Sequence, residues 1–138
     1  MKQFNLNSIK LKITKDNTKR NKVFEHICTM TQAEVKKYVS KKLSKYGKIK
    51  KGDGWVYKKG TVPILLVAHM DTVYTSPVSD LYYDQRKGVL WSPQGLGADD
   101  RAGIFAILKI LQDGFRPTVI FTTDEEKGGL GAAALAAV

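Results

Sequence analysis

Two short apolar segments, each followed at once by reactive side chains, restrict the possible folds of this chain most strongly. The first, residues 62–68, runs into His69 and Asp71, and the second, residues 118–122, runs into three consecutive acids at 124–126. Continuous apolar runs of this length are typical of strands that are buried on both faces. Because open α/β sheets place their ligands at the carboxyl ends of their strands, the sequence predicts an α/β domain with its chemistry at one sheet edge.

The segments around these two runs complete an α/β pattern. Thr31 and Glu34 form the capping box of a helix that should end near Gly47. The order of the elements predicts helices packed on a largely parallel or mixed sheet, with the 62–68 strand in the centre and both hairpins in the same sheet. The expected helices cover residues 23–28, 31–46, 102–111 and 130–138, and the expected hairpins turn at Gly52-Asp53-Gly54 and at Arg86-Lys87-Gly88.

Charge is unevenly distributed along the 138 residues. Residues 1–60 hold 17 Lys and Arg against 4 Asp and Glu, whereas residues 61–138 hold 6 against 9. The basic first part makes a nucleic-acid-binding module the main alternative function. However, its lysines are spread over helix and hairpin faces, and no motif that reads nucleic-acid bases is present. A solvated basic face is therefore favoured over a nucleic-acid-binding surface.

Cysteine usage and apolar patterning predict the compartment. Cys28 is the single cysteine, so an internal disulfide is excluded and a reducing compartment is favoured. Residues 1–15 contain no apolar core of a signal peptide, and no apolar run reaches the roughly 18 residues of a membrane span. We therefore expect a soluble cytoplasmic protein without a membrane partner.

His69 and Asp71 have the spacing of a metal ligand and its orienting partner. Residues i and i+2 of a strand face the same side, and a ligating imidazole needs an acceptor for its second nitrogen. Taken alone, a histidine at a strand end beside a solvated aspartate is the commoner interpretation of this pair.

Two acidic segments strengthen the metal hypothesis. Asp99 and Asp100 stand between closely spaced glycines at the start of a predicted helix, and an N-cap accounts for only one of them. A carboxylate can bridge two cations with its two oxygens. The three acids at 124–126 repel one another unless they are solvated, protonated or shared with cations. An acidic loop that starts a helix is the alternative for this last segment.

Taken together, the three segments resemble the signature blocks of the zinc-dependent, co-catalytic two-metal peptidase superfamily. This superfamily includes peptidase T-like tripeptidases, glutamyl aminopeptidases, aminoacylases and glutamate carboxypeptidases. The matching blocks are His-Met-Asp-Thr-Val at 69–73, Gly-Ala-Asp-Asp-Arg-Ala-Gly at 97–103, and Thr-Asp-Glu-Glu-x-Gly-Gly-x-Gly-Ala at 123–132. They occur in the family's order, and the resemblance covers roughly residues 20–138.

The resemblance implies a role for each matching residue. His69 corresponds to the ligand of one metal, with Asp71 as its orienting partner. Asp99 corresponds to the bridging carboxylate, Glu125 to the general base, and Glu126 to the ligand of the second metal. It also implies that the peptide bond after Asp99 is cis.

The activity implied by the resemblance is metal-assisted hydrolysis of amide bonds. An exopeptidase follows from it, with an aminopeptidase favoured over a carboxypeptidase and with a peptide or an N-acyl amino acid as the substrate. Two Zn²⁺ ions are implied for a complete site, and Co²⁺ or Mn²⁺ are possible replacements. In this interpretation residues 1–20 form a basic arm or strand, and residues 21–138 form the N-terminal part of a peptidase catalytic domain.

The chain departs from the family pattern after Glu126. The family supplies two further ligands downstream, an Asp or Glu and then a His, whereas this sequence stops at Val138 and its other histidine is His26. We therefore expect an incomplete, truncated form that lacks the C-terminal strands and the lid domain and has weak or no activity alone. An oligomer or a complementing chain is then a possible partner. A catalytically inactive interaction domain on the same fold remains an alternative.

Overall fold

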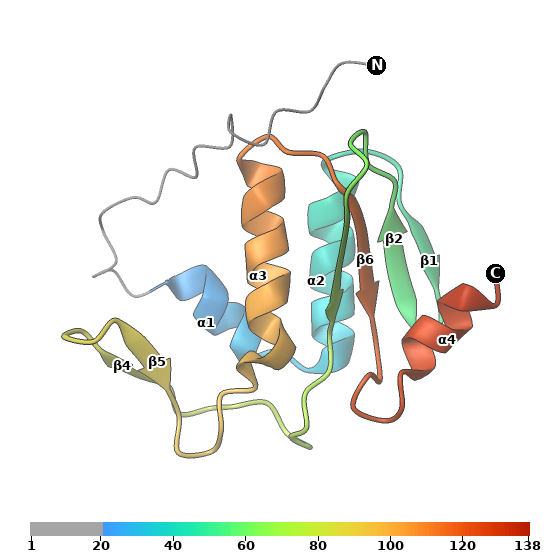
Figure 1. The fold of residues 1–138 in the computed structure, drawn as a ribbon. Coiled ribbons are helices and arrows are strands. Elements are labelled where there is room, and N and C mark those ends of the chain that lie inside the picture. Colours follow the sequence, from blue (N-terminus) through green and yellow to red (C-terminus); the bar gives the residue numbers. More distant parts are fainter. Residues whose placement is uncertain (1–20) are drawn as a thin grey trace.

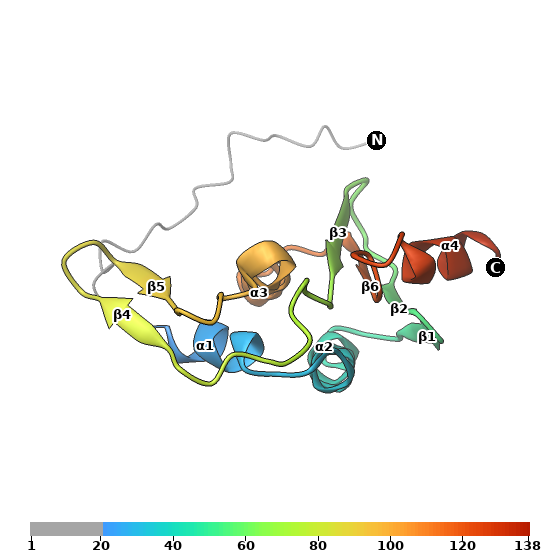
Figure 2. The same ribbon diagram turned by 90° about the horizontal axis from the view of Figure 1, so that it is seen from below.

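The computed structural model describes residues 21–138, and they form a helix-flanked sheet (Figure 1). Figure 2 shows α2 and α3 on one side of the main sheet and α4 on the other, while α1 packs against α3. The helices are α1 Lys22–Cys28, α2 Gln32–Ser44, α3 Ala98–Gln112 and α4 Leu130–Ala136. The strands are β1 Lys50–Gly52, β2 Trp55–Lys58, β3 Leu65–His69, β4 Tyr82–Asp84, β5 Val89–Trp91 and β6 Thr118–Thr122.

The main sheet is mixed and has the order β1-β2-β6-β3. Strand β2 is antiparallel to both β1 and β6, whereas β3 and β6 are parallel, with His69 opposite Thr122. Because these two strands are parallel, the segments that follow β3 and β6 leave the sheet on the same side, at the carboxyl ends of the strands. The α/β fold with a mixed sheet is thereby confirmed, and so is the convergence of the two strand ends.

Two sequence expectations about the sheets are wrong. Strand β3 lies at the edge of the sheet rather than in its centre, and its residues Leu65 and Val67 are each 55% exposed. The inner positions belong to β2 and β6, because the first hairpin pairs with β6 through β2. The second hairpin, β4-β5, is not part of this sheet. It forms a separate two-stranded sheet, in which the rings of Tyr82 and Trp91 stack 5.0 Å apart.

Local sequence signals account well for α2. The Thr31 hydroxyl accepts from the Glu34 amide, and the Glu34 carboxylate accepts from the Thr31 amide, which is the predicted capping box. Val35, Val39 and Leu43 then form the buried face of the helix, towards β2. A helix with this fixed start gives the residues of its first turn a defined position next to the sheet edge.

The core lies between the main sheet and helices α2 and α3. Its largest fully buried side chains include Phe121 from β6, with Ile104 and Leu111 from α3. A buried cation, Arg101, lies at its border, and its Nη1 donates to the carbonyls of Ile27 and Met30 at 2.6 and 3.0 Å. Arg101 therefore ties the start of α3 to the turn between α1 and α2. In the described part of the chain, no helix is long and apolar enough to cross a membrane.

Cys28 is expected to be a poorly reactive thiol. It is buried at the end of α1, and this burial, only partly offset by the positive charge of Arg101, raises the pKa of the Cys28 thiol to about 11. At pH 8 the thiolate fraction then falls from roughly one molecule in four to about one in a thousand. Iodoacetamide at pH 8 should alkylate the folded chain at least about tenfold more slowly than the urea-unfolded chain. Mass spectrometry of timed samples measures both rates, and equal rates would contradict the buried placement.

Candidate active site

A group of three possible metal ligands lies at the carboxyl ends of β3 and β6. His69 is the last residue of β3, Asp99 lies in the first turn of α3, and Glu126 lies in the turn after β6. One ligand atom from each of these residues lies within 4.8 Å of the other two. The described fold therefore brings together residues as far apart in the chain as His69 and Glu126, which are separated by 57 positions. The family resemblance predicts this convergence.

The His69 imidazole lies among carboxylates on both sides. Its Nε2 is 3.2 Å from Oδ1 of Asp99 and 4.0 Å from Oε2 of Glu125. Its Nδ1 is buried and lies 3.3 Å from Oδ1 of Asp71, but the two atoms are too poorly aligned for a hydrogen bond. Nε2 thus faces the group of possible ligands, and Nδ1 faces Asp71.

The surrounding acids determine the titration of this ring. Burial by itself lowers the pKa of His69, but the hydrogen bond with Asp99 and the charges of Asp71, Asp100 and Asp99 outweigh it, so the pKa is raised. The physical meaning is that positive charge is stabilised at this position. A metal cation next to Nε2 would be stabilised by the same carboxylates.

Asp71 organises two parts of the site at once. It is only 6% exposed, and its Oδ1 and Oδ2 accept from the backbone amides of Glu125 and Glu126 at 3.1 and 3.0 Å. The same carboxylate faces Nδ1 of His69. The sequence suggested the contact with the histidine. It did not suggest the contact with residues 124–126, called the acidic turn below, because Glu125 lies 54 residues away from Asp71.

Asp100 has a role that the sequence interpretation missed. Its Oδ2 accepts from the backbone amide of His69 at 3.3 Å, and its Oδ1 accepts from the amide of Gly103 at 3.1 Å. A Cβ atom at position 103 would overlap the Asp100 carboxylate, so glycine leaves space there for this carboxylate. The second aspartate of the pair therefore holds the end of β3 in place, and the glycine three residues later was the signal that could have revealed it.

The start of α3 bends so that its two aspartates point in different directions. Gly97 caps the helix with a φ of 63°, and Asp99 and Asp100 have non-helical backbone angles before the regular helix continues. The peptide bond between Asp99 and Asp100 is cis, as the family resemblance implied. Asp99 faces the His69 ring, and Asp100 accepts from the backbone amide of His69 at the end of β3.

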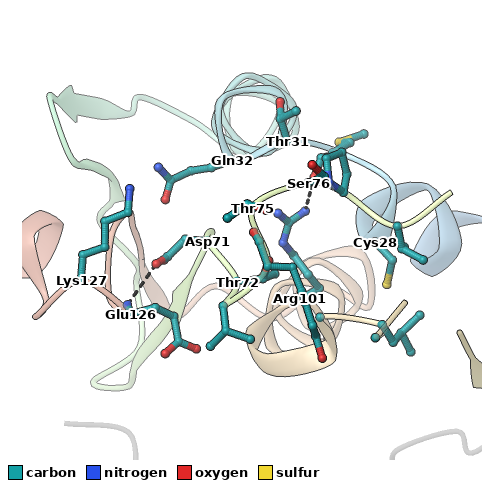
Figure 3. A pocket seen from close by; sticks show the side chains of 18 residues that line it. Cys28, Thr31, Gln32, Asp71, Thr72, Thr75, Ser76, Arg101, Glu126 and Lys127 are labelled. Atoms are coloured by element: carbon teal, nitrogen blue, oxygen red, sulfur yellow. Dashed lines mark hydrogen bonds between the residues drawn. The ribbon is translucent and has the colours of Figure 1, made fainter. Parts of the chain in front are cut away.

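A cavity of about 490 Å³ adjoins this group of residues (Figure 3). Asp71 and Glu126 form one side of it, and Arg101, Thr72, Gln32 and Lys127 also line it. Figure 3 shows the hydrogen bond that joins Asp71 to Glu126 at this side. There is thus space for part of a small molecule immediately beside the candidate ligands.

Comparison with known proteins gives matches among solved structures. No protein-family profile matches the sequence, and no curated protein matches it at a significant level. Aminopeptidase PepT from Bacillus cereus ATCC 10987 is 25% identical to this chain, with a TM-score of 0.63, over 81% of this chain and 38% of that one. A tripeptidase from Staphylococcus aureus subsp. aureus Mu50 is 20% identical, with a TM-score of 0.56, over 72% and 34%. Aminoacylhistidine dipeptidase from Vibrio alginolyticus is 20% identical, with a TM-score of 0.57, over 79% and 28%.

These likenesses cover most of this chain but only 28–38% of the solved structures. All three neighbours carry the name of a peptidase. The structural neighbours therefore confirm that this chain resembles the zinc-dependent two-metal peptidase superfamily, over a part of that family's length.

Proposed function

We propose that this chain carries a zinc site for the hydrolysis of peptide bonds, in which His69, Asp99 and Glu126 bind the metal and Glu125 is the general base. The observation that carries the proposal is the convergence of one imidazole nitrogen and two carboxylates within 4.8 Å of one another. These residues come from the ends of two parallel strands and from the start of α3. Because the three residues lie far apart in the sequence, only the fold can bring them together.

The residues fit zinc by number and by type. Catalytic zinc sites use about three protein ligands and leave one position for water or substrate, and nitrogen and carboxylate oxygen are suitable donors. Co²⁺ and Mn²⁺ accept the same donors. Because the described residues bring three candidate ligands around one gap, we propose one ion per chain, whereas the resemblance implies two for a complete site.

The chain's own residues would divide the work of hydrolysis. A zinc ion held by His69, Asp99 and Glu126 would polarise the substrate carbonyl and lower the pKa of a bound water. Glu125 is half-exposed and lies 4.0 Å from Nε2 of His69, where it can take a proton from the attacking water and return it to the leaving amine. Asp71 would hold the imidazole and the acidic turn in fixed positions relative to each other, because its carboxylate faces Nδ1 of His69 and accepts from the amides of Glu125 and Glu126.

We propose short peptides as substrates, with an aminopeptidase favoured over a carboxypeptidase. The names of the structural neighbours, an aminopeptidase, a tripeptidase and a dipeptidase, support this choice. N-acyl amino acids offer the same scissile amide bond and are the second substrate class. The cavity beside Glu126 supplies space for the residue next to that bond.

The buried Cys28 thiol supports a reducing compartment such as the cytoplasm.

We expect the activity of this chain by itself to be weak. The side chains of Asp99 and Glu125 are 88% and 54% exposed, so the site is open to water. Electrostatic stabilisation of a transition state is strongest where water is excluded and the groups are held in place. Metal binding is accordingly a more sensitive test of the proposal than turnover.

Zinc titration combined with a peptide assay tests the function. Calorimetry should show one zinc ion bound per chain, and trialanine with added zinc should release alanine slowly, as measured by mass spectrometry. The matched variant Glu125→Gln should bind zinc like the wild type and lose hydrolysis, because Glu125 is outside the ligand group. Failure of the wild type to bind zinc would refute the metal site. Zinc binding without any turnover would instead support an inactive interaction domain on this fold.

A further inference from the structure

We propose that Gln32, the first residue of α2, is a positioning residue for the acidic turn that carries Glu125 and Glu126. Its side chain makes a two-point contact with Asp124, the residue that precedes these two glutamates. The functional part of this inference rests on the zinc site proposed above, whereas the structural part concerns the metal-free chain.

The contact between Gln32 and Asp124 joins residues 92 positions apart. Oε1 of Gln32 accepts from the backbone amide of Asp124 at 3.0 Å, and Nε2 donates to Oδ1 of Asp124 at 3.4 Å. An amide side chain supplies both the acceptor and the donor in one rigid plane. Gln32 thus fixes both the backbone and the side chain of Asp124.

Asp124 needs such support because of its backbone conformation. Its φ of 54° lies in the left-handed region, and it is the only described non-glycine residue with a positive φ. Non-glycine residues adopt this region rarely, although aspartate tolerates it better than most. Within the turn, Nζ of the exposed Lys127 also donates to the Asp124 carboxylate at 3.0 Å. The backbone amide of the preceding Thr123 donates to the Gly54 carbonyl at 2.8 Å, and Gln32 adds a contact to Asp124 itself from the start of α2.

Gln32 and Asp71 hold the turn from two sides. The backbone amides of three successive residues, Asp124, Glu125 and Glu126, each donate to a side-chain oxygen, the first to Gln32 and the next two to Asp71. The His69 side of the turn is thus fixed by Asp71, and the α2 side by Gln32. Loss of either support should allow the carboxylates of Glu125 and Glu126 to move relative to His69.

The position of Gln32 is itself well determined. It follows Thr31, whose capping box with Glu34 fixes the start of α2, and Met30 before it accepts from the buried Arg101. Figure 3 shows its side chain extending from α2 towards the side of the cavity where Glu126 and Lys127 lie. A chain of contacts therefore runs from the start of α3 through the start of α2 to the acidic turn.

The test compares Gln32→Met, which keeps the length of the side chain but removes both hydrogen bonds, with the matched control Gln112→Met. Gln112 is an exposed glutamine at the end of α3 that accepts only from Lys109 in the described structure. In the metal-free chain, amide hydrogen exchange at Asp124, Glu125 and Glu126 should accelerate at least about tenfold in Gln32→Met. Zinc affinity should fall about tenfold, the lower end of the effect of removing outer-shell partners. The visible absorption of the Co²⁺-loaded protein should change as well.

A conservative variant separates positioning from a general effect on stability. Gln32→Glu keeps an oxygen that accepts from the Asp124 amide but places its second oxygen against the Asp124 carboxylate, so exchange of that amide and zinc affinity should both fall between those of Gln32→Met and the wild type. Normal exchange, a wild-type Co²⁺ spectrum and zinc affinity within twofold of the wild type in Gln32→Met would overturn the proposal, even if the melting temperature fell. If the wild type binds neither zinc nor cobalt, the metal site fails, while the exchange data still decide whether Gln32 holds the turn.

Discussion

Replacing His69 with alanine is expected to weaken zinc binding by about a thousandfold. His69 supplies the single nitrogen ligand in the group, and its Nε2 faces the carboxylates of Asp99 and Glu125. Structural zinc sites with four ligands bind with roughly 10–16 kcal/mol, so one ligand accounts for about 3–4 kcal/mol and hence for about three orders of magnitude in affinity. Calorimetry, or competition with a chromophoric chelator, measures the change.

His26→Ala is the matched control for this variant, because the chain contains two histidines in all. The His26 ring lies on α1 against the ring of Tyr38, 5.9 Å away between centroids and outside the group of candidate ligands. Its replacement should leave zinc affinity within about twofold of the wild type. If both variants lose zinc to the same extent, or if His69→Ala keeps wild-type affinity, His69 is not a ligand.

Replacing Asp71 with alanine is expected to lower the free energy of unfolding by about 3 kcal/mol and to weaken zinc binding about 10- to 100-fold. The buried carboxylate accepts from two backbone amides and faces Nδ1 of His69. Removal leaves two amides without their acceptor and frees both the ring and the acidic turn. Urea unfolding and zinc titration measure the two effects separately.

Asp71→Asn should fall between the wild type and Asp71→Ala. Its side chain keeps the volume and one acceptor oxygen, but its NH₂ group faces an amide that also donates. Asp113→Ala is the control, because Asp113 is an exposed aspartate at the C-terminal end of α3, opposite to the end of this helix that carries Asp99. A stability loss in Asp113→Ala equal to that of Asp71→Ala would show that the effect is not specific to the site.

Local structure could be predicted from the sequence wherever neighbouring residues supply the physical cause. The capping box of Thr31 and Glu34 predicted the start of α2, and it is present. The apolar run at 118–122 predicted β6, and the glycines at 52 and 54 predicted the first hairpin. In each case the deciding interactions lie within a few residues of one another. The positions of β3 and of the second hairpin were wrong because strand order depends on pairings between distant segments.

The candidate site divides in a similar way. Its candidate ligands could be named from the sequence, because a histidine and several carboxylates placed at strand ends have few roles other than metal binding or solvation. The supporting contacts could not. Asp71 to the acidic turn, Asp100 to the His69 amide and Gln32 to Asp124 join residues 54, 31 and 92 positions apart. Such contacts can be recognised only once the positions of the side chains in the folded protein are known.

The amino-acid sequence by itself determined which elements form and which side chains have the chemistry of metal ligands, because helix caps, turns and apolar runs act over short distances. The tertiary structure decided that β6 rather than β3 is an inner strand and that His69, Asp99 and Glu126 meet at one gap. It also decided that Asp71 and Gln32 hold the acidic turn. The physical reason is that a ligand group is defined by distances of a few ångströms, which arise only when separate strands and helices pack together.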